Sequence, residues 1–143
     1  MEHVPSTPTL KAPAERFTGD VYLNMIATPA EPARLAAALV RFTPGARTNW
    51  HSHALGQTLH ITDGVGLVGT RDGAVIRVSA GETVTCPAGE EHWHGAVGTN
   101  LMAHIAMVVG DGIGDGTIWL EPVTDEQYAA ALATVAEGHA GRS

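Results

Sequence analysis

Short segments of β character, separated by turn-forming pairs, fill most of this 143-residue chain. Gly or Pro stands in most of the breaks, as in Pro44-Gly45, Asp72-Gly73 and Ala80-Gly81. Many short strands with regular turns predict an antiparallel sandwich or barrel and disfavour a parallel α/β sheet. The expected strands are 21–26, 35–43, 58–62, 65–70, 74–78, 83–86, 101–109 and 117–120, with Asp63-Gly64 as the turn between the third and the fourth.

Only the end of the chain predicts a helix. Thr124 can cap its first turn, and Gln127 follows at the spacing of a capping box. Apolar residues then recur at helical intervals up to Gly138, which predicts the stop. A chain of this length should form one domain, made of an N-terminal arm (1–16), a β-barrel (17–123) and a helix packed on the barrel (124–138).

Charge and cysteine content disfavour several classes of function. Eight basic and 15 acidic residues give a net charge of −7, and the basic residues form no run, so no nucleic-acid partner is expected. The single cysteine, Cys86, cannot form an internal disulfide, and its alternating apolar surroundings favour a buried hydrophobe over a nucleophile. No membrane partner is expected, because no apolar run reaches the ~18 residues of a membrane span. The first residues lack a secretory signal, so we expect a cytoplasmic protein.

Two pairs of histidines, His51 with His53 and His92 with His94, are the strongest functional signal. Residues two apart on a strand point to the same face, so each pair should present both imidazoles inward. Buried imidazoles are costly unless they find partners, and ordinary packing does not explain four of them. The two pairs therefore predict a metal site.

The sequence around these pairs resembles the cupin superfamily. The first cupin motif has two glycines that enclose His-x-His and an acid or amide, and this chain matches it at Gly45, His51, His53, Gln57 and Gly64. The second motif is matched at Gly81, Pro87, Gly89 and His92, with Ala96 where Asn is usual. The resemblance implies a jelly-roll-like cupin barrel in which His51, His53, Gln57 and His92 bind one divalent ion.

Gln57 stands where most metal-binding cupins have Glu, so all four implied ligands are uncharged. The ion would keep its full positive charge and act as a stronger Lewis acid. Mixed nitrogen and oxygen ligands suit Mn²⁺ or Fe²⁺, and the general affinity order also admits Zn²⁺ or Ni²⁺. Mn²⁺ is the expected cofactor.

Several longer stretches resemble the bacterial cupin hydroxynitrile lyases. They include Trp50-His51-Ser52-His53, the run from Gly89 to Ala96, and the run from Val123 to Tyr128. The resemblance implies manganese-dependent cleavage and formation of mandelonitrile, from benzaldehyde and hydrogen cyanide. It also implies that His104 is an active-site residue. We expect His104 to be the principal base, with His94 as its partner, and a satisfied core histidine is the alternative for His104.

Two other functions fit the same metal site. An Fe²⁺ oxygenase acting on a small organic substrate would consume O₂, whereas a lyase would work without it. A cupin that binds a small molecule without turnover is the third possible function.

Trp50 and Trp93 should point away from the metal and pack elsewhere. We expect the cavity wall to be formed by Leu39, Leu59, Leu101, Ile105 and Met107, and the chain to form a homodimer or homotetramer.

Overall fold

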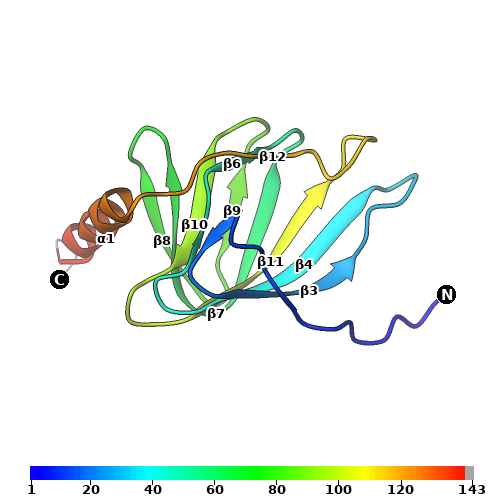
Figure 1. The fold of residues 1–143 in the computed structure, drawn as a ribbon, viewed down its shortest axis with the longest axis horizontal. Helices are drawn as coiled ribbons and strands as arrows, with labels where there is room; N and C mark the ends of the chain where they lie inside the picture. Colours follow the sequence, from blue (N-terminus) through cyan, green and yellow to red (C-terminus); the bar gives the residue numbers. More distant parts are fainter. Residues whose placement is uncertain (141–143) are drawn as a thin grey trace.

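The computed structural model describes residues 1–140, which form twelve β-strands and one helix (Figure 1). The strands curl into an antiparallel barrel, and the helix lies at one side of it (Figure 1). The predicted all-β barrel with a short C-terminal helix is confirmed. In residues 1–140, no helix is both long and apolar enough to cross a membrane. The elements are β1 (Leu10–Lys11), β2 (Phe17–Thr18), β3 (Val21–Ala27), β4 (Leu35–Phe42), β5 (Arg47–Thr48), β6 (His51–His53), β7 (Gln57–Thr70), β8 (Val75–Ser79), β9 (Thr83–Cys86), β10 (His92–Ala96), β11 (Met102–Val109), β12 (Thr117–Trp119) and α1 (Asp125–Ala140).

Two sheets share the long strand β7. Sheet A has the order β1-β3-β4-β11-β7-β9, and its strands are antiparallel throughout. In sheet B, β7 pairs with β8 and β10, and β10 continues to β5 and β6, which pair in turn with β2 and β12. Residues of sheet A that point inward form most of the main core, among them Val21, Phe42, Leu59 and Met102. One strand, β7, thus belongs to both sheets and joins them along one side of the barrel.

The predicted break at Asp63-Gly64 is wrong, because β7 runs unbroken through it. The first half of β7 pairs with β9 and β11, and the second half pairs with β8 and β10. At the change-over Gly64 has φ = 73°, and the register against β11 shifts between Ala103 and His104. Glycine at positive φ bends the strand from one sheet into the other without reversing it. The Asp63-Gly64 pair therefore marks a corner of the barrel, where β7 passes from one sheet to the other.

The Asp72-Gly73 pair, by contrast, forms the predicted hairpin between β7 and β8. Gly73 has φ = 88°, and Asp72 Oδ1 accepts a hydrogen bond from the amide of Ala74 at 3.1 Å. The expected strand at 35–43 is also confirmed as β4, although its alanines have helical propensity.

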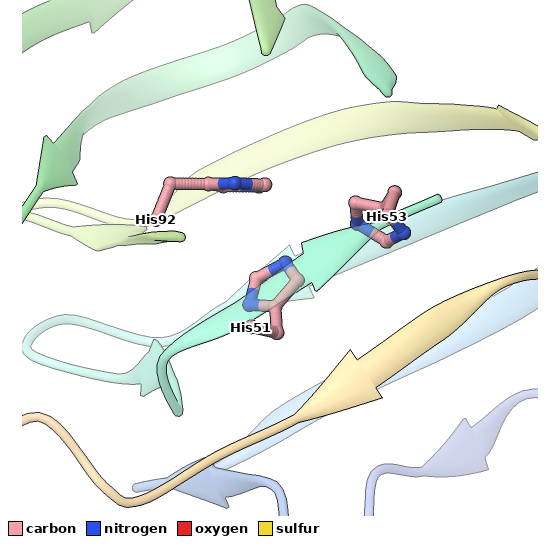
Figure 2. Close-up of side chains that lie close together, drawn as sticks. All are labelled: His51, His53 and His92. Carbon is pink, nitrogen blue, oxygen red and sulfur yellow. The ribbon is translucent and has the colours of Figure 1, made fainter. Parts of the chain in front are cut away.

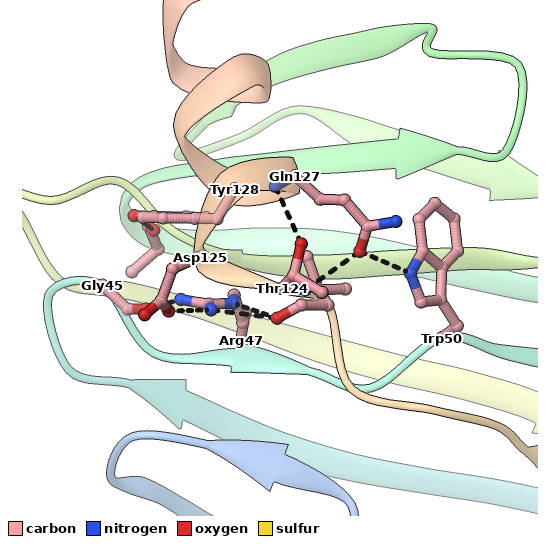
Figure 3. A network of polar contacts seen from close by, with 9 residues as sticks. Gly45, Arg47, Trp50, Thr124, Asp125, Gln127 and Tyr128 are labelled. Atoms are coloured by element: carbon pink, nitrogen blue, oxygen red, sulfur yellow. Dashed lines mark hydrogen bonds and ion pairs between the residues drawn. The ribbon is translucent and has the colours of Figure 1, made fainter.

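Helix α1 covers the outer face of sheet B and is fixed by the predicted capping box (Figure 3). Thr124 Oγ1 accepts from the amide of Gln127 at 3.0 Å, and Gln127 Oε1 accepts from the amide of Thr124 at 2.9 Å. The buried Arg47 holds the start of the helix by donating to Val123 O at 2.9 Å and pairing with Asp125 at 2.8 Å (Figure 3). The helix continues through Gly138 to Ala140.

A second hydrophobic cluster lies under α1. It contains Trp50, Leu67, Trp93, Val123, Tyr128 and Ala131. Strand alternation turns Trp50 and Trp93 toward this cluster while their histidine neighbours point into the barrel, as predicted. Part of the N-terminal arm also lies on the barrel, because β1 pairs with β3 and Thr7 Oγ1 donates to Met25 O at 2.9 Å.

We predict that Gly64→Ala destabilises the fold far more than Gly73→Ala. Both positions have positive φ, which costs a residue with a Cβ about 1 kcal/mol or more. At Gly64 the new Cβ would also collide with the carbonyl of Leu101, whereas nothing lies within 4 Å at Gly73. Urea unfolding should show a loss of about 1 kcal/mol for Gly73→Ala and at least about 3 kcal/mol for Gly64→Ala. Equal losses would contradict the close backbone approach at the barrel corner.

Candidate metal centre

Five histidines and one glutamine from four strands meet inside the barrel. His51 and His53 lie on β6, and His92 lies opposite His51 on the neighbouring β10. The six side chains belong to buried residues, and all four sequence-predicted metal ligands are among them: His51, His53, Gln57, His92, His94 and His104. The alternation of each short strand turns every second side chain inward, so the two His-x-His pairs converge.

The triad of His51, His53 and His92 has the geometry of a metal site (Figure 2). One nitrogen of each ring lies within 4.8 Å of one nitrogen of each of the others. Figure 2 shows His51 and His53 on one strand, with His92 approaching from the other side. This buried triad can bind a divalent ion.

The outer nitrogen of each ring is fixed by a hydrogen bond. Nδ1 of His51 lies 2.9 Å from Asn49 O, and Nδ1 of His92 lies 2.9 Å from Glu90 O. A carbonyl only accepts, so both Nδ1 atoms carry the proton, and each Nε2 presents its lone pair inward. Nδ1 of His53 lies 3.0 Å from Thr117 Oγ1.

The ring nitrogens that face the centre of the triad have free lone pairs, which a metal ion needs. Among residues 1–140, Nε2 of His51 and Nε2 of His53 are buried without a hydrogen-bond partner. Nε2 of His92 lies 3.1 Å from Gln57 Oε1. With Nδ1 protonated, this is a lone pair facing an amide oxygen, which a cation between them would stabilise. The donor set therefore fits a divalent cation.

The electrostatics of the site favour neutral rings. Burial, together with the neighbouring His92, lowers the pKa of His53 to about 4. Burial likewise lowers the pKa of His51 well below its usual value, with His92 adding to the effect, and burial also lowers the pKa of His92. Metal binding requires neutral imidazole, so no proton has to be displaced near neutral pH.

A second pair, His94 and His104, lies beside the triad. Nε2 of His104 is 2.9 Å from Nδ1 of His94, and the ring of His94 is 5.0 Å from that of His51 between centroids. Phe42 packs against both rings of the pair, at 5.9 Å and 5.2 Å. Burial lowers the pKa of His104 to about 4 and that of His94 well below its usual value. The pair is therefore neutral, and one proton lies in its shared hydrogen bond.

A cavity of about 220 Å³ opens beside these groups. Its walls are largely apolar, and its polar end is formed by Gln57 and four of the five histidines, His51, His53, His94 and His104. The apolar wall residues include Phe17, Leu23, Met25, Ala38, Val40, Ala106 and Trp119. The cavity can take a small, mainly apolar molecule with one polar group directed at the histidines.

The predicted cavity wall is wrong in all five residues. On β4 and β11 the inward residues are those in phase with His104, such as Val40 and Ala106. Leu39, Ile105 and Met107 are one residue out of phase and face outward, and Leu101 precedes β11 and is half exposed. Leu59 points inward but lies in the main core away from the cavity.

Two residues of β12 contribute to the site without having been predicted. Thr117 contacts His53, and the ring of Trp119 lies 4.8 Å from that of His51 at an angle of 31°. β12 pairs with β6, and its register places Thr117 opposite His53 and Trp119 opposite His51. The spacing of two between Thr117 and Trp119 was the available signal, but it becomes informative only when the pairing with β6 is known.

We predict that acid destabilises the metal-free protein through these histidines. An unfolded imidazole binds a proton below about pH 6.5, whereas folded His53 and His104 do so only near pH 4. Between these values the unfolded state binds more protons, so the free energy of unfolding falls as the pH is lowered. The slope should be about 1.4 kcal/mol per pH unit for each histidine that stays neutral. Above pH 6.5 this stability is complete, and below pH 4 these two residues cause no further loss.

Urea unfolding of chelator-treated protein across this pH range measures the slope. His104→Leu should reduce it by about 1.4 kcal/mol per pH unit, because one neutral buried imidazole is removed. His60→Asn is the matched control, since His60 lies outside the cavity and bonds to Thr83 Oγ1 at 3.0 Å. A free energy of unfolding that does not change with pH would contradict the neutral cluster.

Comparison with known proteins agrees with this architecture. The cupin domain family matches residues 38–109. An (R)-mandelonitrile lyase of Granulicella tundricola is 44% identical over 128 residues, which cover 90% of this chain and 97% of that protein. The structure of a cupin-like protein from Thermotoga maritima is similar, with a TM-score of 0.81 and 32% identity over 92% of this chain and 97% of that one. A polyketide cyclase from Streptomyces resistomycificus shares the fold, with a TM-score of 0.66 and 18% identity over 90% of both chains. This protein belongs to the cupin family.

Proposed function

We propose that this protein is a manganese-dependent hydroxynitrile lyase that cleaves mandelonitrile into benzaldehyde and hydrogen cyanide and catalyses the reverse addition. The observation that carries the proposal is the neutral His94–His104 pair, which lines the same cavity as His51, His53 and Gln57. The 44% identity to a protein named (R)-mandelonitrile lyase supports this choice of reaction.

His51, His53, His92 and the amide oxygen of Gln57 would hold the metal ion. Three nitrogen donors and one oxygen donor suit Mn²⁺ or Fe²⁺, while Zn²⁺ and Ni²⁺ can also enter such a set. The reaction needs no change of oxidation state, so Mn²⁺ suffices. A divalent ion in this uncharged donor set supplies Lewis-acid charge that favours loss of the hydroxyl proton from a cyanohydrin.

The histidine pair would move that proton. In a neutral pair with one shared hydrogen bond, one of the two outer nitrogens carries a proton and the other has a free lone pair. The outer nitrogens are Nε2 of His94 and Nδ1 of His104, and both are buried without a partner in the described part of the chain. A proton taken up at one of them can pass through the shared bond and leave from the other. We assign His104 as the principal base and His94 as its partner, which together take the hydroxyl proton and return it to cyanide.

The apolar wall would hold the aryl group. Inward positions on β4 and β11 carry small side chains, Ala38 and Ala106, which leave space beside the larger Leu23 and Met25. These walls exclude water from the histidines and turn the polar end of a substrate toward them.

The direct test is mandelonitrile cleavage by Mn²⁺-loaded protein in the absence of oxygen. We expect benzaldehyde and cyanide in equal amounts, and loss of activity when the metal is removed. His104→Ala should retain bound Mn²⁺ but lower kcat at least about 100-fold, because the base is lost. His60→Ala is the matched control and should retain the wild-type rate. An unchanged rate in His104→Ala would overturn the assignment of the base, and dependence of the reaction on oxygen would indicate an oxygenase instead.

A second prediction concerns the size of the substrate. Ala106→Leu adds three carbons to the cavity wall and should raise KM for mandelonitrile at least about 10-fold. The cyanohydrin of a short aliphatic aldehyde should be affected much less, because it does not reach that wall. Steady-state kinetics with both substrates at equal Mn²⁺ content measure the difference. An equal change for both would show that Ala106 does not contact the aryl group.

A further inference from the structure

Arg16 and Asp115 lie at the mouth of the cavity. Of the described residues that line the cavity, Arg16 alone carries a positive charge and Asp115 alone a negative one, because the histidines are neutral. Both charged residues are exposed, whereas the histidines of the cavity are buried. The cavity thus presents uncharged histidines inside and one charge of each sign where it opens to solvent.

The backbone and the ring of Trp119 hold Arg16 at this place. The carbonyl of Arg16 accepts a hydrogen bond from the amide of Asn49 at 2.8 Å, and its own amide donates to Pro13 O at 3.1 Å. The guanidinium lies over the ring of Trp119, 5.4 Å from its centroid, and that ring is 4.8 Å from the ring of His51. Because both distances are short, a molecule little longer than one benzene ring can extend from the triad to the guanidinium.

The guanidinium of Arg16 has free donors. Within residues 1–140 it forms no ion pair, although the chain has 15 acidic and only eight basic residues. Most other basic side chains of the described part form an ion pair or bond to an amide oxygen, namely Lys11, Arg34, Arg41, Arg47 and Arg71. Arg77 on β8 also lacks an ion pair among the described residues, but it lies outside the cavity. Arg16 is therefore the residue that can offer a guanidinium to an anion entering the cavity.

We propose, on the basis of the lyase function above, that Arg16 selects substrates with an anionic end, namely cyanohydrins of aromatic aldehydes that carry a carboxylate. A guanidinium binds a carboxylate through two parallel hydrogen bonds, which fixes the direction of the ligand. The hydroxyl group would then face the histidines, with the aryl ring between them and Arg16. The reaction is unchanged: the bond to the cyanide carbon breaks, its electron pair leaves with cyanide, and the hydroxyl proton is returned to that cyanide. The carboxylate takes no part in this step.

Asp115 is the group at the mouth that opposes an anion. Its carboxylate accepts a hydrogen bond from the amide of Thr117 at 3.0 Å and forms no ion pair with Arg16. Removing the charge of Asp115 should therefore strengthen the binding of an anionic ligand, whereas removing the charge of Arg16 should weaken it. Opposite effects of the two substitutions would depend on charge, which general damage to the cavity would not reproduce.

The test is titration calorimetry of the Mn²⁺-loaded chain with p-(hydroxymethyl)benzoate and p-(hydroxymethyl)benzamide, which are similar in shape and differ in charge. The wild type should bind the carboxylate at least about 10-fold more tightly than the amide, and Arg16→Gln should abolish this preference. Asp115→Asn should increase the preference about threefold. Arg77→Gln is the matched control, because it removes the same charge outside the cavity and should keep the preference. Equal binding of both ligands by the wild type, or a preference that survives in Arg16→Gln, overturns the proposal.

Thermal unfolding and Mn²⁺ content show whether each variant is folded. If Arg16→Gln does not fold, Arg16→Met replaces it, because Met keeps an unbranched apolar stem for contact with Trp119. Cleavage of mandelonitrile and of its p-carboxy derivative separates this proposal from the lyase function. Cleavage of both without preference for the carboxylate contradicts the role of Arg16 and leaves the lyase function intact. Binding of the carboxylate that depends on Arg16, without cleavage of either compound, supports the anion site and contradicts the lyase function.

Discussion

Burial of five imidazole rings in one small barrel is the constraint on which the rest of the structure depends. A buried polar group is costly without a hydrogen bond, and a buried charge is more costly still. The barrel avoids the cost of burying charge by keeping the rings neutral, in line with their lowered pKa values. The cost of burying polar groups without hydrogen bonds is met only in part, since four ring nitrogens remain without a partner among the described residues. All four belong to histidines that line the cavity, so the missing partners must come from what the cavity holds.

Strand alternation connects this site to the outer surface. On β4 and β11 the inward residues, such as Val40, His104 and Ala106, form the cavity wall. The outward residues of the same strands, Leu39 and Ile105, are also apolar and lie opposite each other. Each strand is thus apolar on both sides, a pattern that is usual for strands buried on both faces.

How much of this could be predicted from the sequence depends on the range of the interaction concerned. The two histidine pairs could be predicted to face inward, because the alternation within a strand is local. The resemblance to cupins then implied Gln57 as a metal ligand, and the resemblance to the hydroxynitrile lyases implied His104 as an active-site residue. The corner at Gly64 was misread as a turn, because a glycine with positive φ serves equally in a turn and in a strand that changes sheets. Thr117 and Trp119 were missed, since their place beside His53 and His51 depends on the pairing of β12 with β6.

The incorrect prediction of the cavity-wall residues has a different cause. His104 was predicted to face inward, and alternation then requires Ala106 and Val108 to line the cavity and Ile105 to face away. Choosing the large apolar residues instead assumed that the hydrophobic residues of a strand lie inside. That assumption fails on β11, because both of its faces are apolar. Counting in steps of two from His104 therefore predicts which residues of β11 line the cavity better than their hydrophobicity does.

The hydrogen bonds also divide the five histidines into two groups with different chemical abilities. In the triad, each Nδ1 has a hydrogen-bond partner in the protein, and two of these partners are carbonyls that only accept. The protons of His51 and His92 are thus confined to Nδ1, and their Nε2 lone pairs stay available for a cation. Within residues 1–140, the rings of His94 and His104 are hydrogen-bonded only to each other, so either ring can donate without breaking the bond. A ring with a fixed tautomer suits ligation, and a pair that can exchange its tautomer suits proton transfer. The same residue type can therefore serve two roles in one cavity, because the fold anchors one set of rings and leaves the other free to shift its proton.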